Sequence, residues 1–464
     1  HLKEHGLERG GDETTRLALN WLDENKEGNS FLFLHYFDAH YEYLPPEPFA
    51  SRFSKSPYAG EVAFVDHCIG RVVQRLKDLD IYDSTLLIIV GDHGEMLGEH
   101  GEETHTYFIY ESAIKVPLIV KLPGQKKKIT VVEPVGLVDI VPTVCSLLDF
   151  ETPSRVQGID LSAFLRGEVA VNYERYLYSE SVSPTRFNAS SLMSISTGRW
   201  KFIQAPRAEL YDVVVDPREE ANLLEREPHR VRVLEDKLRE TLELSVRGDL
   251  DNQMVLDDEA IKRLESLGYV AGKEEGGIVF DENKGDPKDF SHLVGLLRQV
   301  NKLIKNKEYD RAKHILRDIA PQCSECGEVY ILLGEVGMLQ GDYEAAVVNY
   351  RRACQIDPTS ISDNVYIKLA WLQATRPSLP SRDIDEAMDY AERIVQKTNF
   401  KDPHALGALG AVHAAIGEYP KATEITQGAR AIAMAADETK LIEALDTCLE
   451  FYKQAKPYVE VRGD

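Results

Sequence analysis

Hydrophobic positions in the first half of the chain alternate between short apolar runs and helical spacing. Apolar runs at residues 31–34, 85–90 and 116–121 are short enough for buried strands, and polar clusters follow the first two. Between the first two runs, residues 61–79 place apolar side chains at steps of three and four, which is typical of a helix with one buried face. Those side chains are Val62, Val65, Ile69, Val72 and Leu76. The order strand, helix, strand predicts a mostly parallel sheet flanked by helices, an α/β fold.

The pattern changes twice further along the chain. Residues 166–270 read as short strands and turns followed by a charged helix over 227–247. Residues 271–290 are rich in Gly, Glu, Asp and Lys, a composition that predicts a linker. We therefore expect the α/β part to cover residues 1–165.

After the predicted linker the pattern is helical and repeats itself. Residues 327–360 show large, small and aromatic positions at the spacing of a two-helix unit 34 residues long. These positions are Tyr330, Leu333, Gly334, Gly341, Tyr343, Ala346, Tyr350, Ala353 and Pro358. Three further units repeat the pair at Tyr343 and Ala346, namely Tyr309 with Ala312, Ile384 with Ala387, and Tyr419 with Ala422. Residues 291–458 therefore resemble the tetratricopeptide repeat family.

That resemblance implies an all-α superhelix of about four units and a capping helix, with a concave surface for a protein or peptide partner. Each repeat would bury its faces against its neighbours, so we expect residues 291–458 to fold independently of the α/β part. The alternative is a repeat array that serves only as a spacer or a dimerisation arm.

The charge balance narrows the range of partners. Lys and Arg number 54 against 77 Asp and Glu, a net charge of -23. Because such a chain repels phosphate backbones, nucleic acid is not an expected partner. An anionic substrate would need a local positive centre, such as a metal ion. No apolar run approaches the roughly 18 residues of a membrane span, so none is predicted.

The six cysteines are too sparse for a disulfide scaffold. Cys323 and Cys326 form one C-x-x-C, but no second pair follows at zinc spacing. We interpret this pair as two thiols near a turn rather than as a zinc or redox site.

Two polar clusters follow the first two predicted strands. Asp92 and His93 open the glycine-rich segment 91–101, and a carboxylate beside an imidazole can ligate one metal ion. The other cluster, residues 35–46, contains His35, Asp38 and His40. Since the carboxyl ends of parallel strands share one edge of a sheet, we expect the two clusters to converge.

The segments 92–101 and 31–49 resemble the metal loop and the substrate-histidine segment of the sulfatase family, within the alkaline phosphatase superfamily. Later landmarks follow in the family's order up to about residue 270. They are 138–143, 158–161, the small C-terminal antiparallel sheet subdomain with 209–212, 216–217 and 222–223, and the tail 264–269. The resemblance implies a metal-dependent hydrolase of sulfate esters, and by itself favours a periplasmic or other extracytoplasmic location.

The resemblance also implies roles for single residues. Asp92 and His93 correspond to metal ligands, and His40 corresponds to a histidine that contacts the sulfate. His105 stands where sulfatases commonly carry Lys, so it would stabilise the leaving oxygen. Calcium is the ion the family implies, with manganese or zinc admitted by His93.

Three further residues receive supporting roles. His100 could lie behind the metal ligands, whereas His35 and Asp38 are expected to hold their loop. Because related phosphodiesterases, phosphonate hydrolases and phosphoethanolamine transferases also use histidines nearby, a phosphoryl-ester substrate or transferase activity stays open. A non-catalytic repeat scaffold is the third alternative.

The family's nucleophile segment is not present in the sequence. In sulfatases a Cys or Ser in an upstream Cys/Ser-x-Pro-x-Arg segment is oxidised to formylglycine, and no Cys-x-Pro-x-Arg occurs here. The chain also begins at His1 without Met or a signal-like segment. We therefore expect an N-terminal truncation, with the formylglycine upstream, and a chain that is inactive alone.

Overall fold

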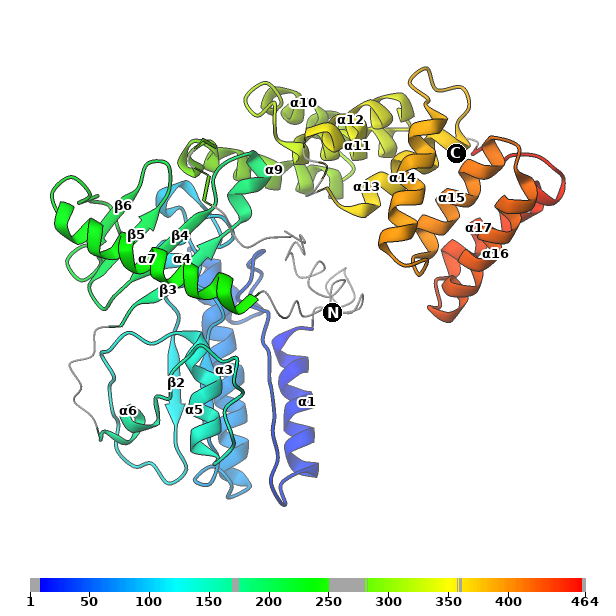
Figure 1. The fold of residues 1–464 in the computed structure, drawn as a ribbon. Helices are drawn as coiled ribbons and strands as arrows, with labels where there is room; N and C mark the ends of the chain where they lie inside the picture. The colour runs from blue at the N-terminus through cyan, green and yellow to red at the C-terminus, as the bar shows by residue number, and fades with distance from the viewer. Residues whose placement is uncertain are drawn as a thin grey trace.

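The structure, a computed structural model, describes residues 9–168, 175–249, 280–281, 283–356, 358 and 361–460. Figure 1 shows long helices and a small sheet in the first half, and an arc of paired helices in the second. The predicted tail at 264–269 and most of the predicted linker, residues 271–279 and 282, lie outside the described residues. No helix in the described part of the chain is long and apolar enough to cross a membrane.

The first and third helices of the first half pack against each other through Leu22, Val72 and Leu76. Its early helices are α1 (Gly11–Glu24), α2 (Phe49–Arg52) and α3 (Pro57–Asp78). The predicted helix over 61–79 is confirmed as α3, but its buried face is rotated relative to the prediction. Phe64 and Cys68 are buried, whereas Val62 is 45% exposed. The apolar steps alone could not separate these two adjacent faces, because both carry large side chains.

Two short strands, β1 (Leu87–Val90) and β2 (Leu118–Lys121), form the sheet of this half and pair antiparallel. The expectation that the described strands of this half run parallel is therefore wrong. A parallel return needs a crossover of a dozen or more residues, usually a helix, on one face of the sheet. Between β1 and β2 the chain forms loops, η1 (Glu99–Gly101) and the four-residue α4 (Glu111–Ile114), so it turns back instead.

The apolar run at residues 31–34 is not a strand. It is extended chain without ladder partners in the described structure, and Phe31 and Phe33 are 83% and 79% exposed. Its composition suits a buried strand, but pairing requires a neighbouring strand, and β1 and β2 pair only with each other. The elements that complete this half are η2 (Leu137–Asp139), α5 (Ile140–Leu147) and α6 (Ser162–Arg166).

A four-stranded antiparallel sheet follows, in the order β3-β4-β5-β6. Its elements are β3 (Leu177–Ser181), η3 (Ser183–Phe187), β4 (Leu192–Ser196), β5 (Trp200–Gln204) and β6 (Glu209–Asp212). The charged helix predicted over 227–247 is α7 (Pro228–Asp249), and it covers this sheet through Leu234 and Leu238. The small antiparallel sheet subdomain is thus present.

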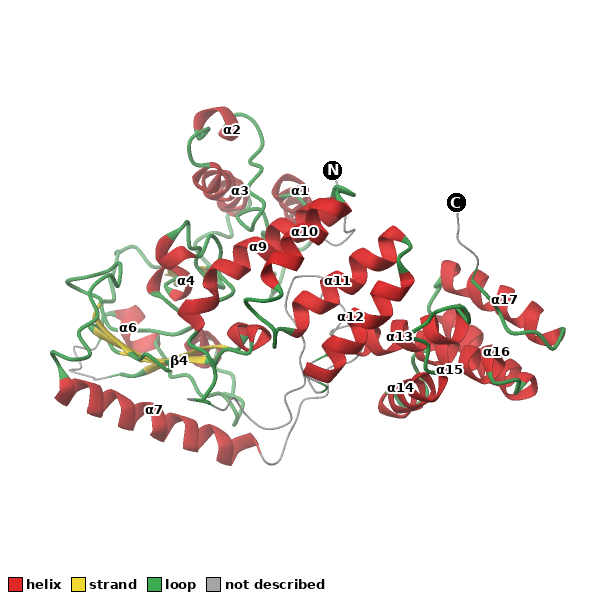
Figure 2. Ribbon diagram, turned by 90° about the horizontal axis from the view of Figure 1, so that it is seen from above, coloured by secondary structure: helices red, strands yellow, loops and turns green. Residues whose placement is uncertain are grey.

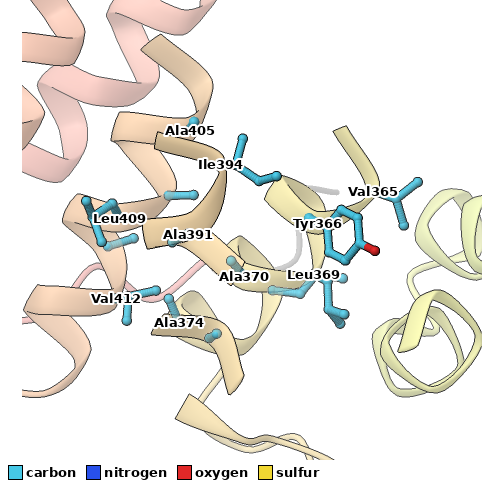
Figure 3. Packing of buried hydrophobic residues seen from close by; sticks show 14 of the residues in the cluster. Val365, Tyr366, Leu369, Ala370, Ala374, Ala391, Ile394, Ala405, Leu409 and Val412 are labelled. Atoms are coloured by element: carbon cyan, nitrogen blue, oxygen red, sulfur yellow. The ribbon is translucent and has the colours of Figure 1, made fainter. Parts of the chain in front are cut away.

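The second half consists of helices packed in consecutive pairs, as the repeat pattern predicts. They are α9 (Pro287–Lys305), α10 (Tyr309–Ile319), α11 (Gly327–Gln340), α12 (Tyr343–Ile356), α13 (Asp363–Thr375), α14 (Ile384–Lys397), α15 (Pro403–Ala415), α16 (Tyr419–Ala435) and α17 (Thr439–Lys453). Figure 3 shows how Leu369, Ala391 and Leu409 pack where the helices meet. At Gly334 an added Cβ would lie 2.5 Å from the Tyr350 ring, so the glycine permits this close approach.

The array is joined to the first half by a shared apolar core. Leu293, Leu297 and Val300 of α9 belong to the same buried cluster as Met96 and Tyr107 of the first half. The expectation that repeats bury their faces only against one another is therefore wrong for α9. That helix begins at Pro287, inside the segment predicted to be linker, and Figure 2 shows it between α10 and α4.

Cys323 and Cys326 lie in the turn between α10 and α11, as expected, with Cα atoms 5.3 Å apart. They are paired as a disulfide rather than present as two free thiols. Cys68, Cys145, Cys354 and Cys448 are free.

Candidate active site

The loop that follows β1 carries the predicted metal residues, and a glycine fixes its shape. The Gly94 amide donates a hydrogen bond to the Ala113 carbonyl at 2.7 Å. A Cβ on Gly94 would lie 2.1 Å from the Ser112 carbonyl oxygen, so only glycine fits. The backbone at Gly94 therefore lies directly against residues 112–113. The His93 side chain next to it lies near the residues that follow η1.

His40 and His93, from the two predicted clusters, lie together with His105. The ring centroids of His93 and His105 are 3.7 Å apart in a stacked arrangement. The His40 ring lies 5.0 Å from that of His105 and 6.3 Å from that of His93. The loop after residue 34 and the loop after β1 therefore converge, although the first does not follow a strand.

Each of these histidines uses its Nδ1 atom within the protein. His40 Nδ1 lies 2.7 Å from the Tyr41 carbonyl oxygen, and His93 Nδ1 lies 2.8 Å from the Gly94 carbonyl oxygen. Since a carbonyl oxygen only accepts, Nδ1 must carry the hydrogen in both rings. His105 Nδ1 faces the Glu95 carboxylate at 3.1 Å, another acceptor when ionised. The Nε2 atoms of all three rings thus remain for groups outside these bonds.

Glu95 is a site residue for which the sequence predicted no role. Its carboxylate is almost completely buried and pairs with His105, whose side chain is 9% exposed. Burial and the nearby Glu95 carboxylate raise the pKa of Tyr43 far above its usual value. Sequence shows Glu95 only as one more polar residue of a glycine-rich loop. Its ten-residue separation from His105 matches no local motif, so only the fold reveals the pair.

Asp92 and His93 present two metal-type donors on the open side of the loop. Asp92 Oδ1 lies 3.8 Å from His93 Nε2, and the Asp92 side chain is 66% exposed. A metal-bound histidine usually gives its other N–H to a carbonyl or carboxylate, and His93 Nδ1 does so. These two residues fit part of a coordination shell. Within the described ranges no three His, Cys, Asp or Glu side chains form a group that could hold a metal ion.

The position of His40 makes its ring harder to protonate than a free imidazole. Burial lowers the pKa of His40, and the neighbouring His105 and His93 rings act in the same direction. The Tyr41 carbonyl opposes them by accepting from Nδ1. A neutral His40 with Nδ1–H offers a lone pair at Nε2, whereas donation from Nε2 requires the protonated ring.

A second buried carboxylate, Glu102, organises the backbone around His105. It accepts hydrogen bonds from the amides of Thr106, Tyr107 and Phe108 at 3.1, 2.9 and 2.8 Å. Burial raises the pKa of Glu102, while these amides and Arg298 act in the opposite direction. The sequence reading missed Glu102 because its partners are backbone amides, which leave no trace in side-chain patterns.

The three supporting residues each make separate contacts with neighbouring segments. Asp38 is buried and accepts a hydrogen bond from the Gly11 amide at 2.9 Å, which ties its loop to α1. The His35 ring makes an edge contact with Phe37. His100 stacks on Tyr110 and its Nε2 lies 3.0 Å from the Arg218 carbonyl oxygen. These contacts suit residues that hold loops; the expected place of His100 behind the metal ligands stays a prediction.

Comparison with known protein families confirms the two resemblances. The Sulfatase family model matches residues 10–150, and the model for the N-sulphoglucosamine sulphohydrolase C-terminal region matches residues 98–247. The SHNi-TPR model matches residues 327–356. A sulfatase-like catalytic part is therefore fused to a TPR-like helical region.

Individual relatives agree with this assignment. Mouse Arylsulfatase K is 32% identical over 193 residues, which cover 39% of this chain and 34% of that protein. An arylsulfatase of Clostridium perfringens is 29% identical over 202 residues, or 42% of this chain and 40% of that protein. The chain thus spans little more than a third of the length of these relatives.

Among solved structures, the chain is similar to a putative sulfatase from Bacteroides fragilis. Its identity is 20% and its TM-score 0.45, over 50% of this chain and 58% of that chain.

Proposed function

We propose that the first half of this chain contributes the sulfate-recognition side of a sulfatase-type active site, which hydrolyses a sulfate ester. One observation carries the proposal. His40, His93 and His105 converge with their Nδ1 atoms bound inside the protein and their Nε2 atoms left for external groups. The similarity to sulfatases over the same residues supports it.

His105 is the proposed proton donor to the leaving oxygen. The Glu95 carboxylate lies 3.1 Å from Nδ1, so an imidazolium at this position would have a countercharge directly behind it. Its Nε2–H would then face outward, toward the substrate. When the S–O bond to the alcohol breaks, that proton would pass to the alcohol oxygen and leave His105 neutral.

His40 is proposed to contact the sulfate group beside His105. In its neutral form it orients without donating, and in its protonated form it donates from Nε2 to a sulfate oxygen. Asp92 and His93 would hold a divalent cation, with calcium as the expected ion. When bound, that ion supplies positive charge for the sulfate oxygens in a protein whose net charge is -23.

The bond-breaking step needs a nucleophile, and the Cys-x-Pro-x-Arg segment that carries it in many sulfatases does not occur in the sequence. In the proposed intact enzyme the nucleophile, a formylglycine in sulfatases, would attack sulfur and form a covalent intermediate. We therefore expect the chain 1–464 to bind aryl sulfates without turning them over. Metal-dependent turnover that survives repurification would show that a nucleophile lies within it.

The binding experiment uses isothermal titration of the 464-residue chain with 4-nitrocatechol sulfate in the presence of calcium. His40→Gln and His105→Gln should each weaken binding by roughly 10-fold or more, the loss of one charge-assisted hydrogen bond. The matched control is His314→Gln, because the His314 side chain is 79% exposed on α10. Affinity unchanged in both site variants, or no saturable binding, would overturn the proposal.

The same titration separates the alternatives. Binding of 4-nitrophenyl phosphate at least 10-fold tighter than of its sulfate would favour the phosphoryl-ester alternative. Absence of binding to either ester would favour a non-catalytic scaffold.

We propose in addition that the helical array binds a protein or peptide partner. The support is the match to a TPR family model and the consecutive helix pairs from α9 to α16.

A further inference from the structure

The first helix of the array, α9, lies directly against the loop that carries His105. Leu293, Leu297 and Val300 of this helix share a buried cluster with Met96 and Tyr107. The Tyr107 hydroxyl also donates to the Pro287 carbonyl, at the start of α9, at 2.8 Å. The helix is thus held against the loop along two of its turns and at its beginning.

One charged side chain on α9 reaches the loop itself. Arg298 Nη2 donates to Thr104 Oγ1 at 2.5 Å and lies 3.8 Å from Glu102 Oε1. The Arg298 side chain is mostly buried and Glu102 almost completely so. A guanidinium group in this position can contact a hydroxyl and a carboxylate at the same time, because its N–H groups are held in one rigid plane.

The two partners of Arg298 bracket His105 along the chain. Thr104 precedes His105 directly, and its carbonyl accepts from the Met96 amide at 2.9 Å. Glu102 accepts from the amides of the three residues after His105, at 106–108. The backbone on both sides of His105 therefore depends on groups that Arg298 contacts.

We propose that Arg298 is a positioning residue for His105, which makes the first helix of the repeat array a working part of the catalytic unit. Arg298 acts through Thr104 and Glu102, and it is not itself expected to touch the substrate. The proposal rests on the proposed function for the role of His105. It goes beyond that function because it assigns to the array a structural task in the site in addition to partner binding.

The first test measures amide hydrogen exchange by mass spectrometry in the 464-residue chain, for Arg298→Gln and Arg298→Lys. Arg186→Gln is the matched control, since Arg186 also joins the two halves, through an ion pair with Glu328 on α11. In Arg298→Gln, exchange at 106–108 should accelerate about 10-fold, the loss of one charge-assisted contact. Arg298→Lys should restore part of the protection, and Arg186→Gln should leave this segment unchanged.

The outcomes separate positioning from general loosening. Equal acceleration at 106–108 in Arg186→Gln and Arg298→Gln would overturn the proposal, as would unchanged exchange in Arg298→Gln. Exchange in α13 to α16 reports whether the array stays folded. If Arg298→Gln unfolds α9, Arg298→Lys must still show intermediate protection for the proposal to stand.

A double-mutant cycle then asks whether Arg298 acts through His105. Arg298→Gln should weaken 4-nitrocatechol sulfate binding several-fold in the wild-type and His40→Gln backgrounds, but hardly at all in His105→Gln. A purely structural role would add the same loss in all three backgrounds and would overturn the positioning role. If the wild-type chain binds no aryl sulfate, the proposed function fails, while the exchange result still decides whether Arg298 holds the loop.

Discussion

The two loops that meet at the site are held in different ways. The loop around His40 follows an exposed extended segment, and two of its anchors are single backbone amides that donate to Asp38 and Glu61. The loop around His105 contains buried carboxylates. One of these, Glu102, accepts hydrogen bonds from three backbone amides. Two other parts of the molecule support it, the helix α9 and the small antiparallel sheet.

The contribution of the small sheet is visible at the end of the second loop. The Tyr110 hydroxyl donates to Glu209 on β6 at 3.2 Å, and the Glu111 amide donates to Glu219 at 2.6 Å. Lys201 on β5 is fully buried and pairs with Glu219 at 2.9 Å. The site thus combines a loop held against α1 and α3 with one built into the junction of three structural parts. These contacts would hold His105 in the fixed geometry that the proposed proton donor needs.

The largest effect is expected from removing apolar support for the second loop. Leu293→Ala on α9 should lower the free energy of unfolding by roughly 4 kcal/mol, because Leu293 is fully buried in the shared cluster. Chemical denaturation measures the loss, and hydrogen exchange should show it on both sides of the junction. Leu339→Ala on α11 is the control, since Leu339 is 51% exposed. A loss confined to the array would show that the two halves are energetically independent.

Removing the carboxylate inside the loop should cost somewhat less. Glu102→Ala leaves three buried amides without their acceptor, so we expect a loss of about 3 kcal/mol in the stability of residues 104–108. Hydrogen exchange of these amides is the measurement. Glu103→Ala is the neighbouring control, because Glu103 is exposed. Similar exchange in the two variants would contradict the role of Glu102.

The loop around His40 should respond more weakly, because Asp38 accepts one backbone amide where Glu102 accepts three. Asp38→Ala removes the acceptor of the Gly11 amide, and we expect a loss of about 1 kcal/mol, seen as a lower denaturation midpoint. Asp66→Ala on the exposed face of α3 provides the control. A loss as large as that of Glu102→Ala would remove the contrast between the loops.

The smallest expected effect is a difference in pH dependence between the loops. Burial lowers the pKa of His40, so the unfolded chain takes up a proton first as the pH falls below about 6.5. The contribution of His40 to the free energy of unfolding is therefore complete above that pH, where the ring is neutral in both states. It is lost as the pH falls. Burial raises the pKa of Glu102, so its contribution changes in the opposite sense and is lost as the pH rises through that pKa.

Denaturation midpoints of the wild type and His40→Gln at pH 7.5 and 5.5 test the His40 part. The wild type should lose more stability on acidification than the variant, by a few tenths of a kcal/mol to about 1 kcal/mol. An equal loss in both proteins would show that His40 does not become harder to protonate on folding.

Local patterns in the sequence determined much of this protein. The spacing of apolar residues was sufficient to predict α3 and the paired helices of the array, because helical periodicity and repeat period are properties of contiguous residues. The identities of Asp92, His93, His40 and His105 were also sufficient to propose a site, and their roles in it stay predictions. Their convergence was expected at a shared edge of a parallel sheet, and the loops do converge, although residues 31–34 form no strand.

Only the tertiary structure decided how these segments are held. The antiparallel direction of β2, the exposure of Phe31 and the docking of α9 each depend on partners far away in the sequence. The pairing of Glu95 with His105, and of Arg298 with Glu102, depends on distances of a few ångströms across separate elements. A sequence pattern reports which faces are apolar or charged, but the partner of each face is chosen by packing, where burial makes an unpaired carboxylate or amide costly.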